Sequence, residues 1–223
     1  MADVTAIVGA GPGLGQALAR RFSEGGHRIA LIARDEAKLD AMATDLGDGA
    51  AGFAADATDI ASLTAALGRV ADRMGPVGVL IHNASRWIAA KATDLDPATL
   101  ASELTLGATA ALAGAQAVLP GMEAAGRGTI LWTGSRMGLH PDRAGTGAPA
   151  LTAAKCALRG LALAGAGHFH ARGIHLATLT IDGTIEPGGP FDPDRIADAF
   201  WAAHVAPRDA WTAERVFDGG AAG

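Results

Sequence analysis

The sequence predicts a single-domain α/β fold in which a doubly wound parallel β-sheet is flanked by helices on both faces. Short apolar runs rich in β-branched residues alternate with longer Ala- and Leu-rich helical runs, an alternation typical of a parallel sheet. The short runs are apolar throughout, as expected for strands covered on both faces. The chain has 223 residues, 49% of them hydrophobic, which suffices for one core, and no linker or repeat interrupts it.

The elements follow from these runs in chain order. We expect helices to begin at four acidic N-cap positions, Asp35, Asp59, Asp96 and Asp192, the last two of which are followed by proline. The last six residues, 218–223, are expected to form a frayed tail. Six strands are expected, at residues 4–8, 27–32, 50–55, 77–82, 128–133 and 174–181.

Composition excludes several classes of function. A net charge of −5 provides no basic field for a phosphate backbone, so nucleic acid is not an expected partner. The single cysteine, Cys156, excludes an internal disulfide and a multi-cysteine metal site, and it suits a reducing cytoplasm. We found no charged leader and no uninterrupted stretch of membrane-spanning length. A cytoplasmic protein without a metal or a membrane partner is expected.

A glycine-rich segment, "GAGPGLG", lies between the first strand and an amphipathic helix. Three residues separate Gly9 from Gly13, and one separates Gly13 from Gly15. Glycine lets the backbone turn sharply and approach a pyrophosphate, while the start of the helix provides free N–H groups and a partial positive charge. We therefore expect dinucleotide binding in a Rossmann-type fold, with Gly9, Gly11, Gly13, Leu14 and Gly15 against the cofactor, rather than a purely structural turn.

The residues after the second and third strands bear on the choice of cofactor. Arg34 stands where an NAD-dependent enzyme has an acid for the ribose 2′-hydroxyl. An arginine pairs with a 2′-phosphate, and a charge-assisted hydrogen bond of about 1.5–3 kcal/mol predicts NADP(H) preferred over NAD(H) by roughly ten- to a hundredfold, with NAD(H) still possible. The alternative is a solvated arginine beside two acidic residues. Asp56 either accepts from the adenine amino group or caps the next helix, and Ala57 is expected beside it.

Four motifs in order resemble the short-chain dehydrogenase/reductase family over nearly the whole chain. They are "GAGPGLG", "HNAS" at 82–85, "GSRMG" at 134–138 and "LTAAKCALRGLA" at 151–162. The resemblance implies that Asn83 and Ala84 lie beside the cofactor and that His82 is a structural substitution.

A fifth segment, "IDGTI" at 181–185, is similar to the family's Pro-Gly segment that closes over the nicotinamide, with Asp182 in place of proline. This similarity implies that Gly183 and Ile185 contact the cofactor. Only a brief Pro/Gly segment separates Ile185 from the helix start at Asp192. Family members usually carry a longer substrate lid, so we expect specificity to be loose or set by a partner subunit.

In the family, a serine, a tyrosine, a lysine and an asparagine act together on a carbonyl or alcohol. The resemblance places Ser135 at the serine that polarises the substrate oxygen and Lys155 at the lysine that holds the nicotinamide ribose. Leu151 occupies the tyrosine position and Gly107 the asparagine position, and the chain contains no tyrosine. Two of the four roles are therefore empty. For Lys155 the alternative is a surface lysine.

The missing tyrosine raises the question of which group supplies a proton. A positioned general acid contributes about 10²–10⁴-fold to a rate, so turnover without one is expected to be slow or altered. His140, five residues past Ser135, is one replacement, although its loop position equally suits a solvated histidine. Lys155 is another if burial lowers its pKa. The four tryptophans either line a substrate cleft or belong to the core or an interface: Trp87, Trp132, Trp201 and Trp211.

Two functions remain open on these grounds. The first is an NADP-dependent oxidoreductase acting on a small carbonyl or alcohol substrate. The second is a cofactor-binding module without catalysis that serves as a redox sensor or an assembly subunit. Two long helices rich in small residues, 98–125 and 151–168, build the dimer interface in the family, so the resemblance implies a homodimer or homotetramer. The same small residues equally suit close packing on the sheet.

Overall fold

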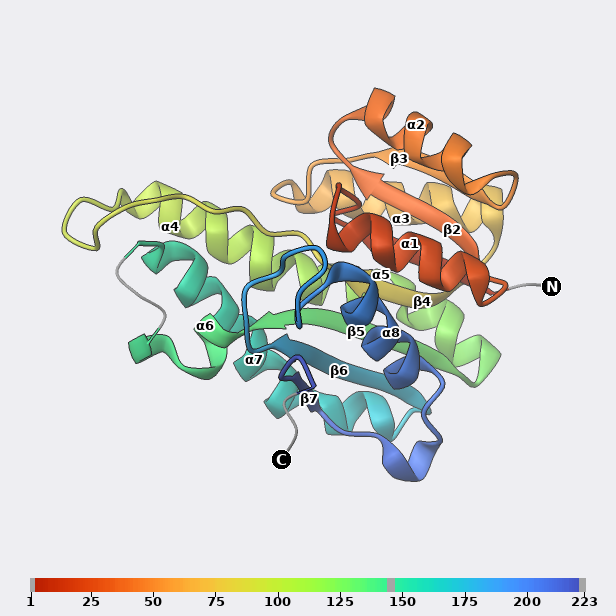
Figure 1. Cartoon of the computed structure of the whole chain (residues 1–223). Helices are drawn as coiled ribbons and strands as arrows, with labels where there is room; N and C mark the ends of the chain where they lie inside the picture. The colour runs from red at the N-terminus through yellow and green to blue at the C-terminus, as the bar shows by residue number, and fades with distance from the viewer. Residues whose placement is uncertain (1–2, 144–146, 221–223) are drawn as a thin grey trace.

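The sheet is parallel and seven-stranded, and it forms the centre of the computed structural model, which describes residues 3–143 and 147–220 (Figure 1). The strand order is β3-β2-β1-β4-β5-β6-β7. The longest ladder joins β5 to β6 over eight residues, from Gly128 opposite Ile174 to Ser135 opposite Ile181. The strands are β1 (Val4–Val8), β2 (Arg28–Ala33), β3 (Ala50–Ala54), β4 (Val77–His82), β5 (Gly128–Ser135), β6 (Ile174–Ile181) and β7 (Glu214–Phe217).

The strand order reverses between β1 and β4. From β1 the chain adds β2 and β3 on one side, and it then crosses to the other side for β4 to β7. In an open parallel sheet, ligands bind at the carboxyl ends of the strands beside such a reversal, because the loops there diverge and leave a crevice. The fold therefore places the expected site above β1 and β4.

Helices cover both faces of the sheet (Figure 1). One face packs against α1 (Leu14–Glu24), α2 (Glu36–Leu46) and α8 (Pro193–His204). The other packs against α3 (Ile60–Met74), α5 (Ala110–Ala125) and α7 (Pro149–His170). The remaining helical elements are α4 (Pro97–Leu104), the π-helical turn η1 (Thr105–Thr109), α6 (Arg136–Leu139), η2 (Pro141–Arg143) and η3 (Arg208–Ala210).

The four acidic N-caps are confirmed. The carboxylates of Asp35, Asp59, Asp96 and Asp192 each accept a hydrogen bond from a backbone N–H in the first turn of α2, α3, α4 and α8, respectively. These bonds satisfy N–H groups that have no partner within the helix, which explains why an acidic residue at these positions starts a helix reliably.

Elements α4, η1 and α5 form one continuous helix, residues 97–125. By length and composition this helix is apolar enough to cross a membrane, a test that the core helix of a globular protein also passes. Here Ala110, Ala111 and Ala115 are fully buried against the sheet, and Leu106 faces the crevice described below. The π turn inserts an extra residue into this helix between α4 and α5.

The structure corrects two expectations about the C-terminal part of the chain. Strand β7 was not expected, because its four residues include Glu214 and Arg215 and lack an apolar run. Its edge pairing with β6 becomes possible because the Glu214 carboxylate receives a bidentate pair from Arg159 at 2.8 Å and the Thr180 hydroxyl at 2.7 Å. The frayed tail is wrong for residues 218–220, since Gly219 is buried and its carbonyl accepts from Arg195 at 3.0 Å; residues 221–223 lie outside the described residues.

Candidate active site

A cavity of about 560 Å³ opens at the carboxyl ends of β1, β2 and β4. This volume lies within the range typical of small-ligand sites. Of the residues expected to bind the cofactor, Gly183 and Lys155 do not line the cavity. It does bring together Gly9, Gly11, Gly13, Leu14, Gly15, Arg34, Asp56, Ala57, Asn83, Ala84 and Ile185.

The glycine loop fits a closely approaching ligand. Gly9 has a φ of +87°, and a Cβ there would lie 2.5 Å from the backbone N of Ala84. A Cβ at Gly15 would lie 2.7 Å from the Gly9 carbonyl oxygen. At Gly11 and Gly13 a Cβ would instead meet no atom within 4 Å, so side chains there would fill open space. Gly9 lets the loop approach the segment after β4, and Gly15 lets the start of α1 pack against the loop. Gly11 and Gly13 leave room for a phosphate beside the start of α1.

Arg34 extends from the end of β2 and lines the cavity. It forms no hydrogen bond or ion pair with any residue in the described ranges 3–143 and 147–220. Its neighbour Asp35 instead pairs with Lys38 at 3.0 Å. The guanidinium is therefore available to a ligand at this end of the crevice.

Asp56 does not cap the next helix, so that alternative is wrong. Its carboxylate accepts from the Thr58 N–H at 2.8 Å and the Thr58 hydroxyl at 2.7 Å, whereas Asp59 is the N-cap of α3. These hydrogen bonds hold the pKa of Asp56 below its usual range, and the fields of Arg34 and Arg86 add smaller lowering effects. Asp56 is thus an ionised acceptor on the cavity wall.

The end of β4 supports the glycine loop. The Asn83 amide donates to the Gly9 carbonyl at 3.1 Å and accepts from the Thr133 hydroxyl at 3.0 Å. His82 is buried, and its Nε2 donates to the Leu106 carbonyl at 2.9 Å. Burial lowers the pKa of His82 to about 4, so its ring is neutral and its role is the structural one expected.

Lys155 is a buried lysine, so the surface alternative is wrong. Only 6% of the residue is exposed, and its Nζ donates to the Thr133 carbonyl at 2.8 Å. Burial lowers the pKa of Lys155 to about 8, against a smaller raising effect from Glu103. The ammonium is therefore buried against β5 and does not line the crevice. Lys155 follows the half-buried Leu151 by one helical turn.

The other predicted catalytic residues, Ser135 and His140, are not bonded to Lys155 within the described part of the chain. The Ser135 hydroxyl accepts from the Met137 N–H at 3.2 Å and caps α6. His140 follows α6, and its ring makes no hydrogen bond to a described residue. No hydrogen bond or ion pair within the described ranges joins Ser135, His140 and Lys155 to one another.

Gly107, at the expected asparagine position, lies in the π turn where this helix crosses α7. A Cβ there would lie 2.9 Å from the Cβ of Ala154. The close crossing of the two helices explains why a residue without a side chain occupies this position.

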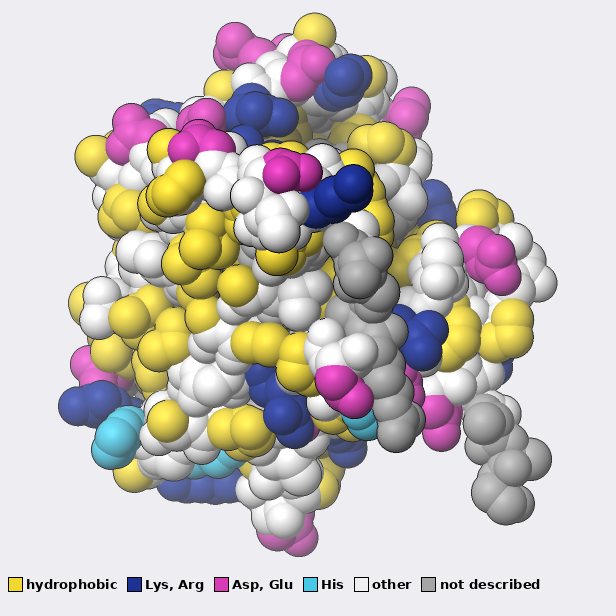
Figure 2. Space-filling model, turned by 90° about the vertical axis from the view of Figure 1, so that its left-hand side faces the viewer, with side chains coloured by type: hydrophobic (Ala, Val, Ile, Leu, Met, Phe, Trp, Pro, Cys, Tyr) yellow, Lys and Arg dark blue, Asp and Glu magenta, His cyan; other side chains and the backbone are white. Residues whose placement is uncertain are grey.

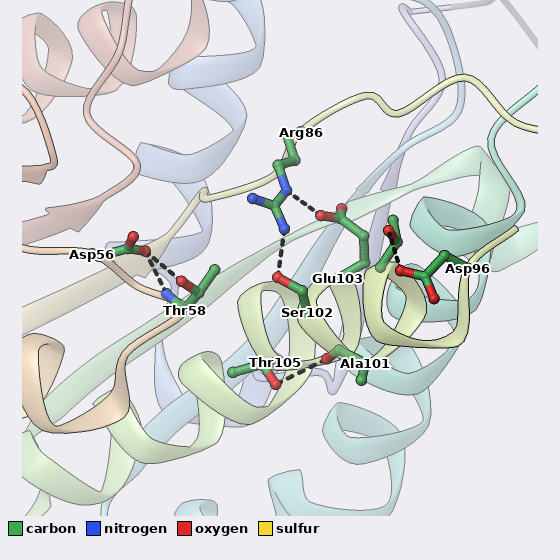
Figure 3. A network of polar contacts seen from close by, with 9 residues as sticks. Asp56, Thr58, Arg86, Asp96, Ala101, Ser102, Glu103 and Thr105 are labelled. Atoms are coloured by element: carbon green, nitrogen blue, oxygen red, sulfur yellow. Dashed lines mark hydrogen bonds and ion pairs between the residues drawn. The ribbon is translucent and has the colours of Figure 1, made fainter.

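A pair of charged residues at the cavity was not expected (Figure 3). Arg86 lines the cavity just after β4, and its guanidinium pairs with the carboxylate of Glu103 and donates to the Ser102 hydroxyl at 2.6 Å. Glu103 is 2% exposed. One signal was available in the sequence: Glu103 stands three residues before Leu106 on an otherwise apolar helix, a spacing that places both on one face.

Three of the tryptophans pack within the protein, so the cleft interpretation is wrong for them. Trp132 is 1% exposed, Trp201 packs on Phe22 beneath the Arg21 guanidinium, and Trp211 stacks on His175. Trp87 is 59% exposed and remains a candidate for substrate contact.

Charges of both signs are mixed with hydrophobic side chains on the face shown in Figure 2. Among the described residues, no group of three or more His, Cys, Asp or Glu side chains is placed to hold a metal ion.

The chain is similar over most of its length to known proteins of one family. The sequence model of the short chain dehydrogenase family matches residues 3–185. Galactitol 2-dehydrogenase (L-tagatose-forming) from Cereibacter sphaeroides is 33% identical over 175 residues, covering 78% of this chain and 68% of the relative. Cis-2,3-dihydrobiphenyl-2,3-diol dehydrogenase from Paraburkholderia xenovorans is 30% identical over 164 residues, which are 71% of this chain but only 58% of that relative's length. The crystal structure of a metagenomic short-chain oxidoreductase in complex with NADP has a TM-score of 0.83 and 27% identity, covering 96% of both chains.

Proposed function

Because the chain belongs to the short-chain dehydrogenase/reductase family of NAD(P)-dependent oxidoreductases, we propose that it transfers hydride between NADP(H) and a small carbonyl or alcohol. The observation that carries the proposal is the crevice at the strand-order reversal, with its glycine loop and the unpaired Arg34 on its wall. The names of the two relatives, dehydrogenases of galactitol and of a dihydrobiphenyl diol, suit an alcohol substrate.

The residues on the wall suit a nicotinamide dinucleotide. Gly11, Gly13 and the start of α1 would receive the diphosphate, Asp56 the adenine amino group and Arg34 the 2′-phosphate. Ile185 would cover the nicotinamide side, and Gly183 would act indirectly, since a Cβ there would lie 2.2 Å from the Phe191 ring. When bound, the nucleotide supplies or accepts the hydride.

Ser135 and Lys155 would serve the substrate side of the reaction. The Ser135 hydroxyl retains its proton for a substrate oxygen, because its oxygen only accepts from the Met137 N–H. Burial lowers the pKa of Lys155 to about 8, which suits proton transfer near neutral pH, and we propose Lys155 in preference to His140 as the proton donor. Its bond to the Thr133 carbonyl uses one of the three N–H donors of the ammonium, which leaves two for the nicotinamide ribose or the substrate.

Calorimetric titration with NADPH and NADH tests the cofactor assignment. NADPH is expected to bind the wild type roughly ten- to a hundredfold more tightly than NADH, and Arg34→Ala is expected to remove this difference. An unchanged preference in the variant would rule out a role for Arg34. An absence of binding by both nucleotides would contradict the proposed function itself.

A second function, a catalytically impaired NADP(H)-binding sensor or assembly subunit, is favoured by the contacts of Lys155. Its Nζ is bonded within the protein, and Leu151 provides no proton. Carbonyl substrates distinguish the two functions: turnover of NADPH above background with any member of a broad panel supports the enzyme. Binding of NADPH without turnover, together with activity gained by Leu151→Tyr, supports the sensor.

We further propose that the protein is a cytoplasmic homodimer or homotetramer. Leu161 and Leu163 on α7 are 37% and 47% exposed, and they suit an interface between subunits. Sedimentation equilibrium would measure the oligomeric state, and a monomer at micromolar concentration would contradict this assignment.

A further inference from the structure

Among the described residues that line the crevice, Arg34 and Arg86 are the two that carry a positive charge. They lie on opposite sides of the glycine loop. Arg34 directly follows β2 and Arg86 lies in the loop after β4, with β1 between those strands in the sheet. Neighbouring strands are about 4.8 Å apart, so the ends of β2 and β4 are separated by roughly 10 Å. One arginine therefore faces the adenosine side of the crevice, and the other stands on the nicotinamide side of the loop.

The guanidinium of Arg86 is held in one orientation before any ligand arrives. Its Nε pairs with Glu103, and its Nη2 donates to the Ser102 hydroxyl at 2.6 Å, both residues lying on α4 (Figure 3). A guanidinium has five N–H donors, so these two bonds leave donors for a ligand. The Arg86 side chain is 35% exposed, and the residue lines the cavity.

The pairing with Glu103 prevents Arg86 from turning into solvent. Glu103 is buried, and a buried carboxylate without a partner is strongly destabilising. The carboxylate therefore fixes the guanidinium, and the conformational entropy of the arginine is lost on folding and not on ligand binding. The field of Glu103 also raises the pKa of Lys155, against the larger lowering effect of burial.

We propose that Arg86 binds the diphosphate of the nucleotide and that Glu103 is a positioning residue for it, an inference that rests on the proposed function. The diphosphate is the anionic group expected over the glycine loop, and Arg86 shares one cavity with all four of its glycines. Ser135, where the substrate is expected, does not line that cavity. Arg86 and Asp56 line the same cavity, so the guanidinium belongs to the pocket that holds the rest of the expected nucleotide site.

The two arginines have different expected effects on nucleotide choice. Both cofactors carry the diphosphate, and only NADP(H) carries the 2′-phosphate. Loss of Arg86 should therefore weaken NADPH and NADH equally, whereas loss of Arg34 should weaken NADPH alone. The ratio of the two dissociation constants separates these roles.

The test uses the double variant Arg86→Gln with Glu103→Gln, because Arg86→Gln alone leaves a buried carboxylate unpaired and endangers folding. By calorimetry we expect the dissociation constants of NADPH, NADH and ADP to rise roughly tenfold or more in the double variant, with the NADPH-to-NADH ratio unchanged. Arg20→Gln with Asp194→Asn, which removes an exposed ion pair between α1 and α8, is the matched control and should leave all three unchanged.

Glu103→Gln alone tests the positioning role. It should weaken all three ligands severalfold while Arg86 is still present, although it removes a negative charge near an anionic ligand. Simple electrostatics would instead strengthen binding, so a loss of affinity would report the lost orientation of the guanidinium.

Three results would overturn the inference while the wild type still binds nucleotide. A folded double variant that binds NADPH and NADH within twofold of the wild type would reduce Arg86 to a structural clamp. Selective loss of NADPH would assign Arg86 to the 2′-phosphate. Glu103→Gln with unchanged or higher affinity would remove the positioning role. A wild type that binds no nucleotide would instead overturn the proposed function as well.

Discussion

Replacement of Lys155 by methionine is expected to stabilise the folded protein at pH 7. Burial lowers the pKa of Lys155 from 10.5 to about 8, and one pKa unit corresponds to about 1.4 kcal/mol, so the charged amino group costs the folded state about 3 kcal/mol. The methionine gives up the hydrogen bond to the Thr133 carbonyl, a net loss of about 1 kcal/mol. The free energy of unfolding should therefore rise by about 2 kcal/mol.

The pH dependence gives this prediction a second, independent test. Because the folded-state pKa of Lys155 is depressed, the cost is fully present below about pH 8. It is relieved as the pH rises from about 8 to 10.5, where the unfolded chain still binds the proton and the folded protein does not. The advantage of Lys155→Met should therefore shrink over this interval.

Urea unfolding without nucleotide, followed by tryptophan fluorescence from pH 7 to 10, measures both effects. The exposed Lys91, replaced by methionine, is the matched control and should show neither effect. The reasoning is refuted if Lys155→Met is less stable than the wild type at pH 7, or if the difference between the two proteins stays constant up to pH 10.

Three further changes address the unusual active site. Leu151→Tyr should raise the rate of carbonyl reduction by about 10²-fold or more if a positioned acid is what the site lacks, measured by NADPH consumption at 340 nm; an unchanged rate would point to misplacement of the lysine instead. Gly107→Asn should lower the free energy of unfolding by about 1–3 kcal/mol, because its Cβ would lie 2.9 Å from that of Ala154, and thermal denaturation with the variant as stable as the wild type would contradict this. Gly9→Ala should abolish nucleotide binding, since its Cβ would lie 2.5 Å from the Ala84 nitrogen at a φ of +87°; calorimetry that detects wild-type affinity would show that the loop tolerates movement.

Local chemistry explains why most of the fold was predictable from the sequence. The six long strands are apolar runs, and the acidic residues that begin helices act on backbone groups two or three positions away. The short strand β7 was missed because Glu214 and Arg215 interrupt any apolar pattern there. Its charge is satisfied by Arg159, 55 residues away, a contact that no local pattern contains.

In the candidate site, too, the residues set by local sequence were predictable, and the contacts set by tertiary packing were not. Residues of the glycine loop and the strand ends were identifiable because a chain with this strand order brings them to one edge. The orientation of Lys155 toward Thr133 was not identifiable from the sequence, because it depends on how α7 packs over β5. The pairing of Arg86 with Glu103 likewise joins a loop to a helix and depends on tertiary packing.

The π turn at Thr105–Thr109 constrains how this helix can vary in length. Each residue of an α-helix advances its direction by roughly 100°, so deleting one residue from the turn would rotate one section relative to the other by about that amount. Either Glu103 and Leu106 would leave the crevice side, or Ala110 and Ala111 would leave the sheet. The extra residue thus lets one section of the helix face the crevice while the next section packs on the sheet. A one-residue deletion there should be tolerated less well than most point substitutions.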